Sequence, residues 1–552
     1  SSTSPILSDI IISNNSATNG GGIACILNSS PSLKDVKIIN NTSSENGGGM
    51  YCQWTPTMTL KNVSIINNSA VNNGGGMYCI DSSDPELTNV TIAGNSASDK
   101  GGGIYLFWSM NPSLLNSIIW NNSPENIYSV ENTVPNIITV SYSDIGEGQD
   151  SIATEGTTTI NWGSGNIDVD PMFADTANGN YDLLASSNLI NAGHPDSTDS
   201  DGSRADIGAF PYLNTYSGPT WYVSTSGSDT SGTGAAGNAF SSIQAGINFS
   251  SSGDSVTVAA GTYTENIDYS GKNLIIIGEN RETTIIDGNQ SGSVVGFWNG
   301  EDSTTVLSGF TIQNGSATYG GGIHCANNSN PNLNNLIVRD NVCGSINSGG
   351  GAGVYCNDSS PTIEGVIIRD NASQDVGGGL YCSNNSNPIL TDVLIEGNSA
   401  VGGSLEGFVW RGGGGLNCYN SSPVLTNVTI TENTSSDFGG GISIIHLVNE
   451  EWTTYTESNP VLVNTILWNN SPDEIYNACP PDSGSISVSY SDVQGGLDSI
   501  GLPNEGTIVW GSGNIDVDPM FADTASGDYR LLALSPAINA GHPDSTDSDG
   551  SR

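Results

Sequence analysis

The chain has 552 residues, of which 56 are acidic and 12 basic, and its formal net charge is −44. A charge of this sign and size excludes nucleic acid and anionic membrane surfaces as partners. No apolar run is long enough for a transmembrane helix and no signal peptide is visible, so we expect no membrane-spanning segment in this chain.

A Gly-Gly-Gly motif recurs every 27 residues in the first part of the chain. Gly47–Gly49 leads to Cys52, and the same spacing connects glycine triplets to Cys25 and Cys79. A short motif kept in phase over several copies is typical of a solenoid, in which each turn buries its apolar face on the next. Residues 47–73 combine a glycine turn with three short alternating strands, which predicts one turn of a parallel β-helix.

Alternation along these strands places Met50 and Cys52 on the inner face and Tyr51 on the outer face. We therefore expect stacked, buried and reduced thiols. These ladder cysteines are Cys25, Cys52, Cys79, Cys325, Cys356, Cys382 and Cys418. Cys343 and Cys479 lie off the ladder, which makes them the better disulfide candidates.

An asparagine corner repeats as regularly as the glycines, for example at Asn41, Asn68 and Asn95. Asparagine tolerates left-handed backbone angles, and stacked asparagine side chains can hydrogen bond from turn to turn. Where two asparagines are adjacent, it is the second that recurs in every copy of the repeat. A structural corner therefore explains these positions better than glycosylation does.

A longer repeat of 348 residues contains the coils, because segment 166–173 returns unchanged at 514–521 and segment 191–204 at 539–552. We therefore expect a window on a longer tandem array. Apolar residues between Phe240 and Phe249 have helical spacing, which predicts a short capping helix at the start of the full copy. The expected divisions are coils at 1–140, an Asp-rich tail and linker at 141–218, an initial strand and the capping helix at 219–253, coils at 254–478, and a second Asp-rich tail at 479–552.

Several segments carry a family resemblance. Three segments resemble the first coils of secreted bacterial right-handed parallel β-helix proteins of the pectate-lyase-like superfamily. They are Tyr222-Val223-Ser224, Gly261–Asn266 and Leu307–Ile312. The glycine-triplet coils are similar to those of polymorphic outer-membrane proteins, and the tail from Asp168 to Gly208 resembles the region that precedes surface anchors. The resemblance implies an all-β, right-handed parallel β-helix at the cell surface. It does not specify an activity, because this fold hosts lyases, hydrolases, adhesins and inert stalks.

The resemblance implies that a lyase would use a basic residue beside calcium-binding acids. Arg339 and Arg369 lie on regular coils, each within an Arg-Asp-Asn sequence. Asp340 and Asp370 form a conceivable carboxylate pair for inverting hydrolysis; alternatively, each pairs with its neighbouring arginine at an exposed turn. Since His194 and His542 also lack a partner nucleophile, the sequence predicts a protein without enzymatic activity.

The acidic tail carries candidate calcium ligands. Asp199, Asp201 and Gly202 match three positions of an EF-hand loop, but Ser197 occupies its first position and no glutamate closes it. The candidate metal residues are Asp196, Asp199, Asp201 and Asp206, with Asp544, Asp547 and Asp549 in the second copy. The alternative is a solvated acidic linker. Calcium is the only cofactor that we expect.

A stripe of tyrosines faces outward if the cysteines face inward. Its members are Tyr51, Tyr78, Tyr105, Tyr355 and Tyr381. Exposed aromatic residues in a row can bind glycans or dock a neighbouring solenoid. The alternative is that they stabilise their own strands by stacking on each other.

Together these features predict an extracellular structural protein, a repetitive β-solenoid stalk or filament component at the cell surface. Its expected partners are other copies of itself or neighbouring solenoids, and glycans. A glycan-binding adhesin or a polysaccharide-active enzyme on the same fold is the alternative.

Overall fold

The computed structural model describes residues 4–131, 134–344, 349–401, 412–445, 457–480, 484–503 and 506–545. The chain forms two compact units. The first unit comprises residues 1–217 with 229–233, and the second comprises residues 218–228 with 234–552.

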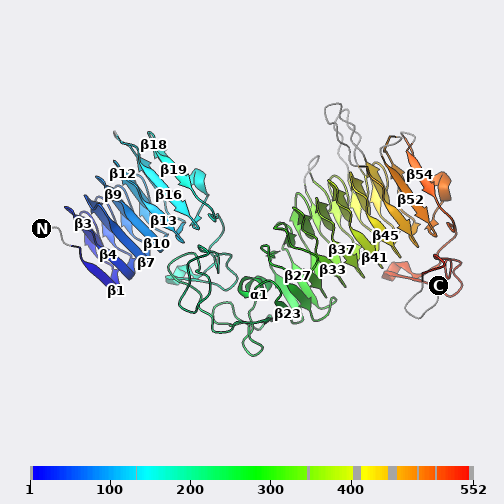
Figure 1. Ribbon diagram of the computed structural model, residues 1–552, viewed down its shortest axis with the longest axis horizontal. Coiled ribbons are helices and arrows are strands. Elements are labelled where there is room, and N and C mark those ends of the chain that lie inside the picture. Colours follow the sequence, from blue (N-terminus) through cyan, green and yellow to red (C-terminus); the bar gives the residue numbers. More distant parts are fainter. Residues whose placement is uncertain are drawn as a thin grey trace. The chain divides into compact units, whose positions relative to one another are not determined.

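The first unit is a parallel β-solenoid whose strands lie side by side, turn after turn (Figure 1). Its longest sheet follows the order β1 (Ile6–Ser13), β4 (Ser32–Ile39), β7 (Met58–Ile66), β10 (Pro85–Ala93), β13 (Ser113–Leu115), β16 (Ile137–Ser141), β19 (Thr159–Trp162), with β14 (Ile118–Trp120) and β17 (Asp144–Ile145) attached. A second sheet contains β3 (Ile23–Ile26), β6 (Met50–Gln53), β9 (Met77–Ile80), β12 (Ile104–Phe107), β15 (Ile127–Val130) and β18 (Ile152–Glu155). The short strands β2 (Ser16–Ala17), β5 (Thr42–Ser43), β8 (Ser69–Ala70) and β11 (Ser96–Ala97) form a third.

The second unit repeats this architecture with more turns (Figure 1). Its longest sheet has the order β22 (Thr220–Val223), β23 (Ser255–Val258), β26 (Ile275–Gly278), β29 (Val306–Ser308), β33 (Asn332–Asn334), β37 (Thr362–Glu364), β41 (Ile389–Thr391), β45 (Val424–Thr426), β49 (Val461–Val463), β52 (Ser485–Ser489), β54 (Thr507–Trp510). The next has the order β24 (Gly261–Thr264), β27 (Thr284–Asp287), β30 (Thr311–Gln313), β34 (Ile337–Arg339), β38 (Ile367–Arg369), β42 (Leu394–Glu396), β46 (Thr429–Thr431), β50 (Ile466–Trp468), β53 (Asp492–Val493).

Two further parallel sheets belong to the solenoid of the second unit. One contains β25 (Ile267–Asp268), β28 (Val295–Phe297), β32 (Ile323–Ala326), β36 (Val354–Asn357), β40 (Leu380–Ser383), β44 (Leu416–Tyr419), β48 (Ile442–Ile445) and β51 (Ile475–Asn477). The other contains β31 (Ser316–Ala317), β35 (Val342–Cys343), β39 (Ala372–Ser373), β43 (Ser399–Ala400) and β47 (Thr434–Ser435). The predicted parallel β-solenoid is therefore confirmed in both units.

The glycine triplets form tight corners where neighbouring turns come close. Gly47 has φ of 67°, which a side chain would disfavour. A Cβ atom on Gly48 would lie 2.4 Å from the carbonyl oxygen of Ser69, so only glycine fits there. Because β6 and β9 pair in register, Met50 faces Met77 and Cys52 faces Cys79 inside the core.

One short helix covers the first turns of the second unit. α1 (Ile243–Phe249) begins at Ser242, whose hydroxyl accepts a hydrogen bond from the backbone N–H of Ala245. Ile243 and Ile247 are fully buried, as the helical spacing predicts. None of the helices in the described ranges is long and apolar enough to cross a bilayer.

Each unit ends in a tail that folds back along its own solenoid. In the first unit, β20 (Phe173–Asp175) and β21 (Asn180–Leu183) form an antiparallel hairpin, and the Tyr181 hydroxyl donates to Asn67 Oδ1 at 3.0 Å. Farther along the tail, the N–H of His194 donates to Asn116 Oδ1 at 2.7 Å. The second unit has the corresponding hairpin of β55 (Phe521–Asp523) and β56 (Asp528–Leu531).

All nine cysteines are buried and free. The ladder cysteines point into the core, as expected. Cys343 and Cys479 form no disulfide: Cys343 lies on β35 and donates its thiol to the carbonyl of Gly350, and both side chains are fully enclosed. Burial raises the pKa of Cys343 to about 11 and that of Cys479 to about 12, so both thiols are protonated at neutral pH.

Buried, protonated thiols react slowly with thiol reagents. We expect the native protein at pH 8 to show no rapid labelling, and all nine cysteines to be labelled after unfolding. Cys25 is the most exposed of the nine at 7%, so it is expected to be labelled first, in a slow reaction of the native protein. Cys25→Ser should remove this slow labelling reaction. Counting labelled thiols by mass spectrometry checks this. Rapid labelling of several cysteines, or a total below nine after unfolding, would contradict the structure.

Candidate functional site

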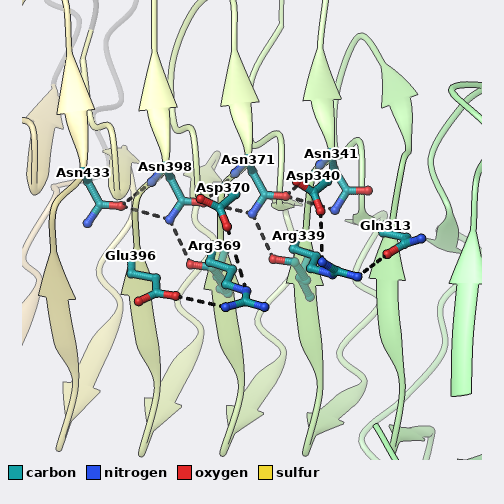
Figure 2. Close-up of polar contacts among 12 residues, drawn as sticks. Gln313, Arg339, Asp340, Asn341, Arg369, Asp370, Asn371, Glu396, Asn398 and Asn433 are labelled. Atoms are coloured by element: carbon teal, nitrogen blue, oxygen red, sulfur yellow. Dashed lines mark hydrogen bonds and ion pairs between the residues drawn. The ribbon is translucent and has the colours of Figure 1, made fainter. Parts of the chain in front are cut away.

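A ladder of asparagine side chains runs along one corner of each solenoid. In the second unit it passes from Asn341 through Asn371 and Asn398 to Asn433 (Figure 2). Each side-chain nitrogen donates to the Oδ1 of the next asparagine at 2.9–3.0 Å. Asn41, Asn68 and Asn95 form the same ladder in the first unit, which fits the structural interpretation of this corner.

A row of charged and polar side chains lies beside this ladder in the second unit (Figure 2). Arg339 Nη2 donates to Gln313 Oε1 at 2.8 Å, and Arg369 Nη1 lies 3.6 Å from Glu396 Oε1. Glu396 is almost fully enclosed, and burial raises its pKa, although the neighbouring Arg369 opposes this effect.

Asp340 and Asp370 stand at the exposed corners that follow the two arginines. Asp340 lies 3.5 Å from Arg339 and Asp370 lies 3.9 Å from Arg369. Each aspartate is therefore paired with its own neighbour. The structure does not hold the two carboxylates as an isolated catalytic pair.

The hairpin of the second unit lies against one end of this row. A Cβ atom on Gly527 would lie 3.7 Å from Arg369 Nη1 and 4.0 Å from Glu396 Oε1, and Tyr529 on β56 helps to lower the pKa of Glu396 against the effect of burial. In the first unit the tail hairpin instead packs on an apolar row that includes Ile66 and Ala93, through Tyr181 and Phe173. The hairpin thus packs on an apolar row in the first unit, in addition to the hydrogen bond from Tyr181 to Asn67, and on a charged row in the second unit.

The predicted tyrosine stripe forms a continuous stack. Ring centroids are 5.4 Å apart for Tyr51 and Tyr78, and 5.0 Å apart for Tyr78 and Tyr105. Tyr128, which the sequence analysis missed, extends the stack at 5.8 Å. Because the rings lie face to face, most of their faces are already covered.

The second unit carries the corresponding residues. The ring of Tyr355 lies 5.3 Å from that of Tyr381 and 4.8 Å from that of Tyr319. Burial raises the pKa of Tyr355 to about 12. Tyr355 is therefore a neutral, buried member of the stack.

The aspartates of the first tail accept hydrogen bonds from the backbone. Asp206 Oδ1 and Oδ2 accept the N–H groups of Asn191 and Tyr212, both at 2.7 Å, and burial raises the pKa of Asp206 to about 8. Asp199 Oδ2 accepts the N–H of Asp206 at 2.8 Å. Burial opposes ionisation of Asp201, but hydrogen bonds from Ser203 and Asn214 outweigh it and lower the pKa.

The remaining candidate calcium ligands lie near these turns. The backbone N–H groups of Asp196 and Asp544 donate to the neighbouring histidine rings, whereas Asp547 and Asp549 lie outside the described residues. Across the described ranges, no group of three or more His, Cys, Asp or Glu side chains could hold a metal ion. Calcium binding by this tail stays a prediction.

A second corner of the first unit carries two exposed tryptophans. Trp54 and Trp108 are 47% and 41% exposed, and they flank a cavity of about 200 Å³. The cavity is lined by Asn28, Trp54, Pro56, Asp81, Ser82 and Trp108. Gln53 Nε2 donates to Asp81 Oδ2 at 2.8 Å and so holds this carboxylate in place.

Both tryptophans have left-handed backbone angles, with φ of 53° for Trp54 and 68° for Trp108. Such angles are unusual for bulky residues and are typical of asparagine and aspartate. The equivalent corner of the second unit carries Asn327, Asp358, Asn384 and Asn420, all with positive φ. Neither the backbone geometry nor the packing of this corner therefore requires tryptophan. Residues in strained backbone conformations often take part in binding.

The spacing of the two tryptophans in the sequence is a signal for this corner. Trp54 and Trp108 are 54 residues apart, which is twice the 27-residue repeat. They therefore occupy the same place two turns apart.

One comparison with known proteins supports the fold. Residues 2–141 match a family described as right handed beta helix region, which confirms the predicted handedness for this part of the chain. No curated protein matches the chain. A pectate lyase, Pel9A, has a similar structure at 12% identity and a TM-score of 0.37, covering 60% of this chain and 92% of that chain. A pectin methylesterase variant in complex with a hexasaccharide matches at 13% identity and a TM-score of 0.26, covering 57% of this chain and 93% of that chain.

These structures correct the prediction that the chain lacks enzymatic activity. Both similar solved structures are polysaccharide-active enzymes, so the β-helix is no ground for excluding an activity. At this level of identity the likeness concerns the fold alone.

Proposed function

We propose that this chain is an extracellular repeat protein whose rigid β-solenoid carries a glycan-binding site on its first unit. The observation that carries this proposal is the pair of exposed tryptophans, Trp54 and Trp108, which line a cavity together with polar side chains. The tandem construction and the turn-rich, acidic composition fit a stalk at a cell surface.

The tryptophan corner has the chemistry that sugars require. The C–H face of a pyranose packs on an aromatic ring, and its hydroxyl groups hydrogen bond to polar side chains such as Asp81 and Ser82. Two turns of a parallel sheet separate the indoles by about 10 Å, a span that an oligosaccharide can bridge.

The solenoid holds this corner rigidly. The backbone N–H of Trp108 donates to Val130 at 3.2 Å, and the carbonyl of Trp54 accepts from Asn28 at 2.7 Å. A site that is rigid before binding loses little conformational entropy when a ligand arrives.

Charge narrows the class of glycan. With a net charge of −44 and the Asp81 carboxylate in the cavity, polyuronates are repelled. Neutral or amino-sugar oligosaccharides are therefore the expected ligands.

Replacing either tryptophan with asparagine tests the site without harming the fold. Asparagine occupies the same corner at Asn384 and suits the left-handed angle. Trp54→Asn and Trp108→Asn are therefore expected to keep or raise the melting temperature while weakening glycan binding roughly tenfold or more. A glycan array followed by calorimetry on the best neutral oligosaccharide measures this.

Leu27→Asn is the matched control, because Leu27 occupies the same corner one turn before Trp54 but does not line the cavity. This variant should bind like the parent chain. The proposal would be wrong if both tryptophan variants bound the oligosaccharide as tightly as the parent chain does, or if they unfolded.

A further inference from the structure

The tryptophan corner of the first unit also carries Asp81, which lies on the turn between the two tryptophans. Trp54, Asp81 and Trp108 follow one another at intervals of 27 residues. Each comes directly after a strand of the same parallel sheet, in which β6 pairs with β9 and β9 pairs with β12 in register. The corner therefore presents an aromatic ring, a carboxylate and a second aromatic ring on three successive turns.

Hydrogen bonds between the turns fix the spacing of these side chains. The backbone N–H of Trp54 donates to the carbonyl of Ile80 at 3.4 Å. The N–H of Ser82 donates to the carbonyl of Trp108 at 3.2 Å. Because neighbouring parallel strands lie about 4.8 Å apart, Asp81 stands about 5 Å from each tryptophan along the solenoid axis, and the two tryptophans stand about 10 Å apart.

This alternation has the period of a flat β-1,4-linked chain of pyranoses. In such a chain each sugar is turned over relative to the one before it, so every second ring presents the same face. The length of this two-sugar repeat matches the distance of about 10 Å between alternate turns of the sheet. Two alternate rings can therefore stack on Trp54 and Trp108, with one ring between them at Asp81.

The middle turn offers hydrogen bonds in place of an aromatic ring. Gln53 Nε2 donates to Asp81 Oδ2 at 2.8 Å and so fixes the direction of the carboxylate. Ser82 beside it is exposed, and both residues line the cavity. Asp81 and Ser82 can therefore bind the hydroxyl groups of the middle sugar, and a few fixed polar groups of this kind give an apolar site its specificity.

We propose that the tryptophan corner binds a β-1,4-linked glycan chain that runs along the solenoid axis, with two alternate sugars on the two indoles. This inference rests on the proposed glycan-binding function and adds to it the linkage and the direction of the chain. A trisaccharide is the shortest ligand that reaches both tryptophans. Chains that coil, such as α-1,4-linked and β-1,3-linked glucans, turn their third ring away from the second indole.

Calorimetry of the full chain with disaccharides and trisaccharides of matched composition tests the proposal. The probes are β-1,4-linked glucose, β-1,4-linked N-acetylglucosamine, α-1,4-linked glucose and β-1,3-linked glucose. In at least one β-1,4-linked series, the trisaccharide should bind roughly tenfold or more tightly than the disaccharide, because it engages the second indole. The α-1,4-linked and β-1,3-linked series should show no such gain.

Trp108→Asn should abolish this gain, so that the variant binds the trisaccharide and the disaccharide alike. Leu27→Asn is the matched control and should keep the gain, since Leu27 occupies the same corner but does not line the cavity. Circular dichroism verifies that both variants are folded.

The possible failures separate this inference from the proposed function. If the chain binds glycans but the β-1,4-linked series show no gain, or if a coiled chain binds as tightly, the inference is wrong and the glycan-binding site stands. The inference is also wrong if Trp108→Asn keeps the gain. If no glycan on the array binds, both the inference and the proposed function are wrong.

Discussion

Asn68→Ala is expected to lower the free energy of unfolding of the first unit by about 4 kcal/mol. Asn68 is completely buried, and its Oδ1 accepts both the backbone N–H and the Nδ2 of Asn41, at 2.9 and 3.0 Å. Its own Nδ2 donates to Asn95 Oδ1 and to the carbonyl of Ile38. Alanine would leave several enclosed polar groups without partners, and each costs about 1–3 kcal/mol.

Scanning calorimetry should show the effect as a fall of about 10 °C in the melting temperature of the first unit. Asn40→Gly is the matched control. Asn40 precedes a ladder asparagine but is exposed with φ of 56°, so glycine suits its backbone. If Asn68→Ala costs no more than this control, the ladder does not stabilise the solenoid.

Glu474→Asn is expected to remove a pH-dependent loss of stability from the second unit. Glu474 ends the asparagine ladder, since Oε1 accepts the backbone N–H of Asn470 and Oε2 accepts its Nδ2. Burial raises the pKa of Glu474 from 4.5 to about 7. Because the folded state binds this proton more tightly than the unfolded state does, stability falls as pH rises from about 4.5 through 7.

This shift corresponds to about 3 kcal/mol, at 1.36 kcal/mol for each pKa unit. The difference in unfolding free energy between the parent chain and Glu474→Asn should therefore change by about 3 kcal/mol between pH 4.5 and pH 8. Asp492, whose pKa burial raises to about 6, acts in the same direction in both proteins and cancels in this difference.

The first unit provides the reciprocal experiment. Asn126, which stands 348 residues before Glu474, closes its ladder with an amide, and its Oδ1 accepts the N–H and the Nδ2 of Asn122. Asn126→Glu should transfer the pH dependence to the first unit. Parallel stability profiles for Glu474→Asn and the parent chain would contradict the assignment.

The coil could be predicted from the sequence because its constraints are local and repeated. Gly48 has no room for a Cβ atom, Asn68 needs a buried partner one turn away, and Cys52 needs an inward position. In the first turns of the chain these constraints return every 27 residues, so they are visible without knowing any long-range contact. The asparagine and cysteine ladders followed directly from that spacing.

The course of the tail could not be predicted in the same way. The contact between Tyr181 and Asn67 joins residues that are 114 positions apart, and no periodic pattern in the sequence predicts it. The sequence of the acidic tail predicts a solvated or calcium-binding linker, and it gives no sign that Asp199 and Asp206 accept backbone N–H groups within a folded segment. Calcium binding by this tail stays a prediction.

The tryptophan corner was missed for another reason. Trp54 and Trp108 depart from the repeat instead of following it, so they do not belong to the set of residues that recur from turn to turn. Their exposure and their left-handed angles become visible only in the folded chain.

The backward course of the tail also determines how a unit responds to mechanical load. In a plain solenoid, turns touch only their neighbours, so a pulling force can peel them off one at a time. Here one tail is fastened to three separate turns, at Asn67, Thr91 and Asn116. The end turn cannot unwind far before these three hydrogen bonds are loaded together, so the first unit is expected to resist tension as one body.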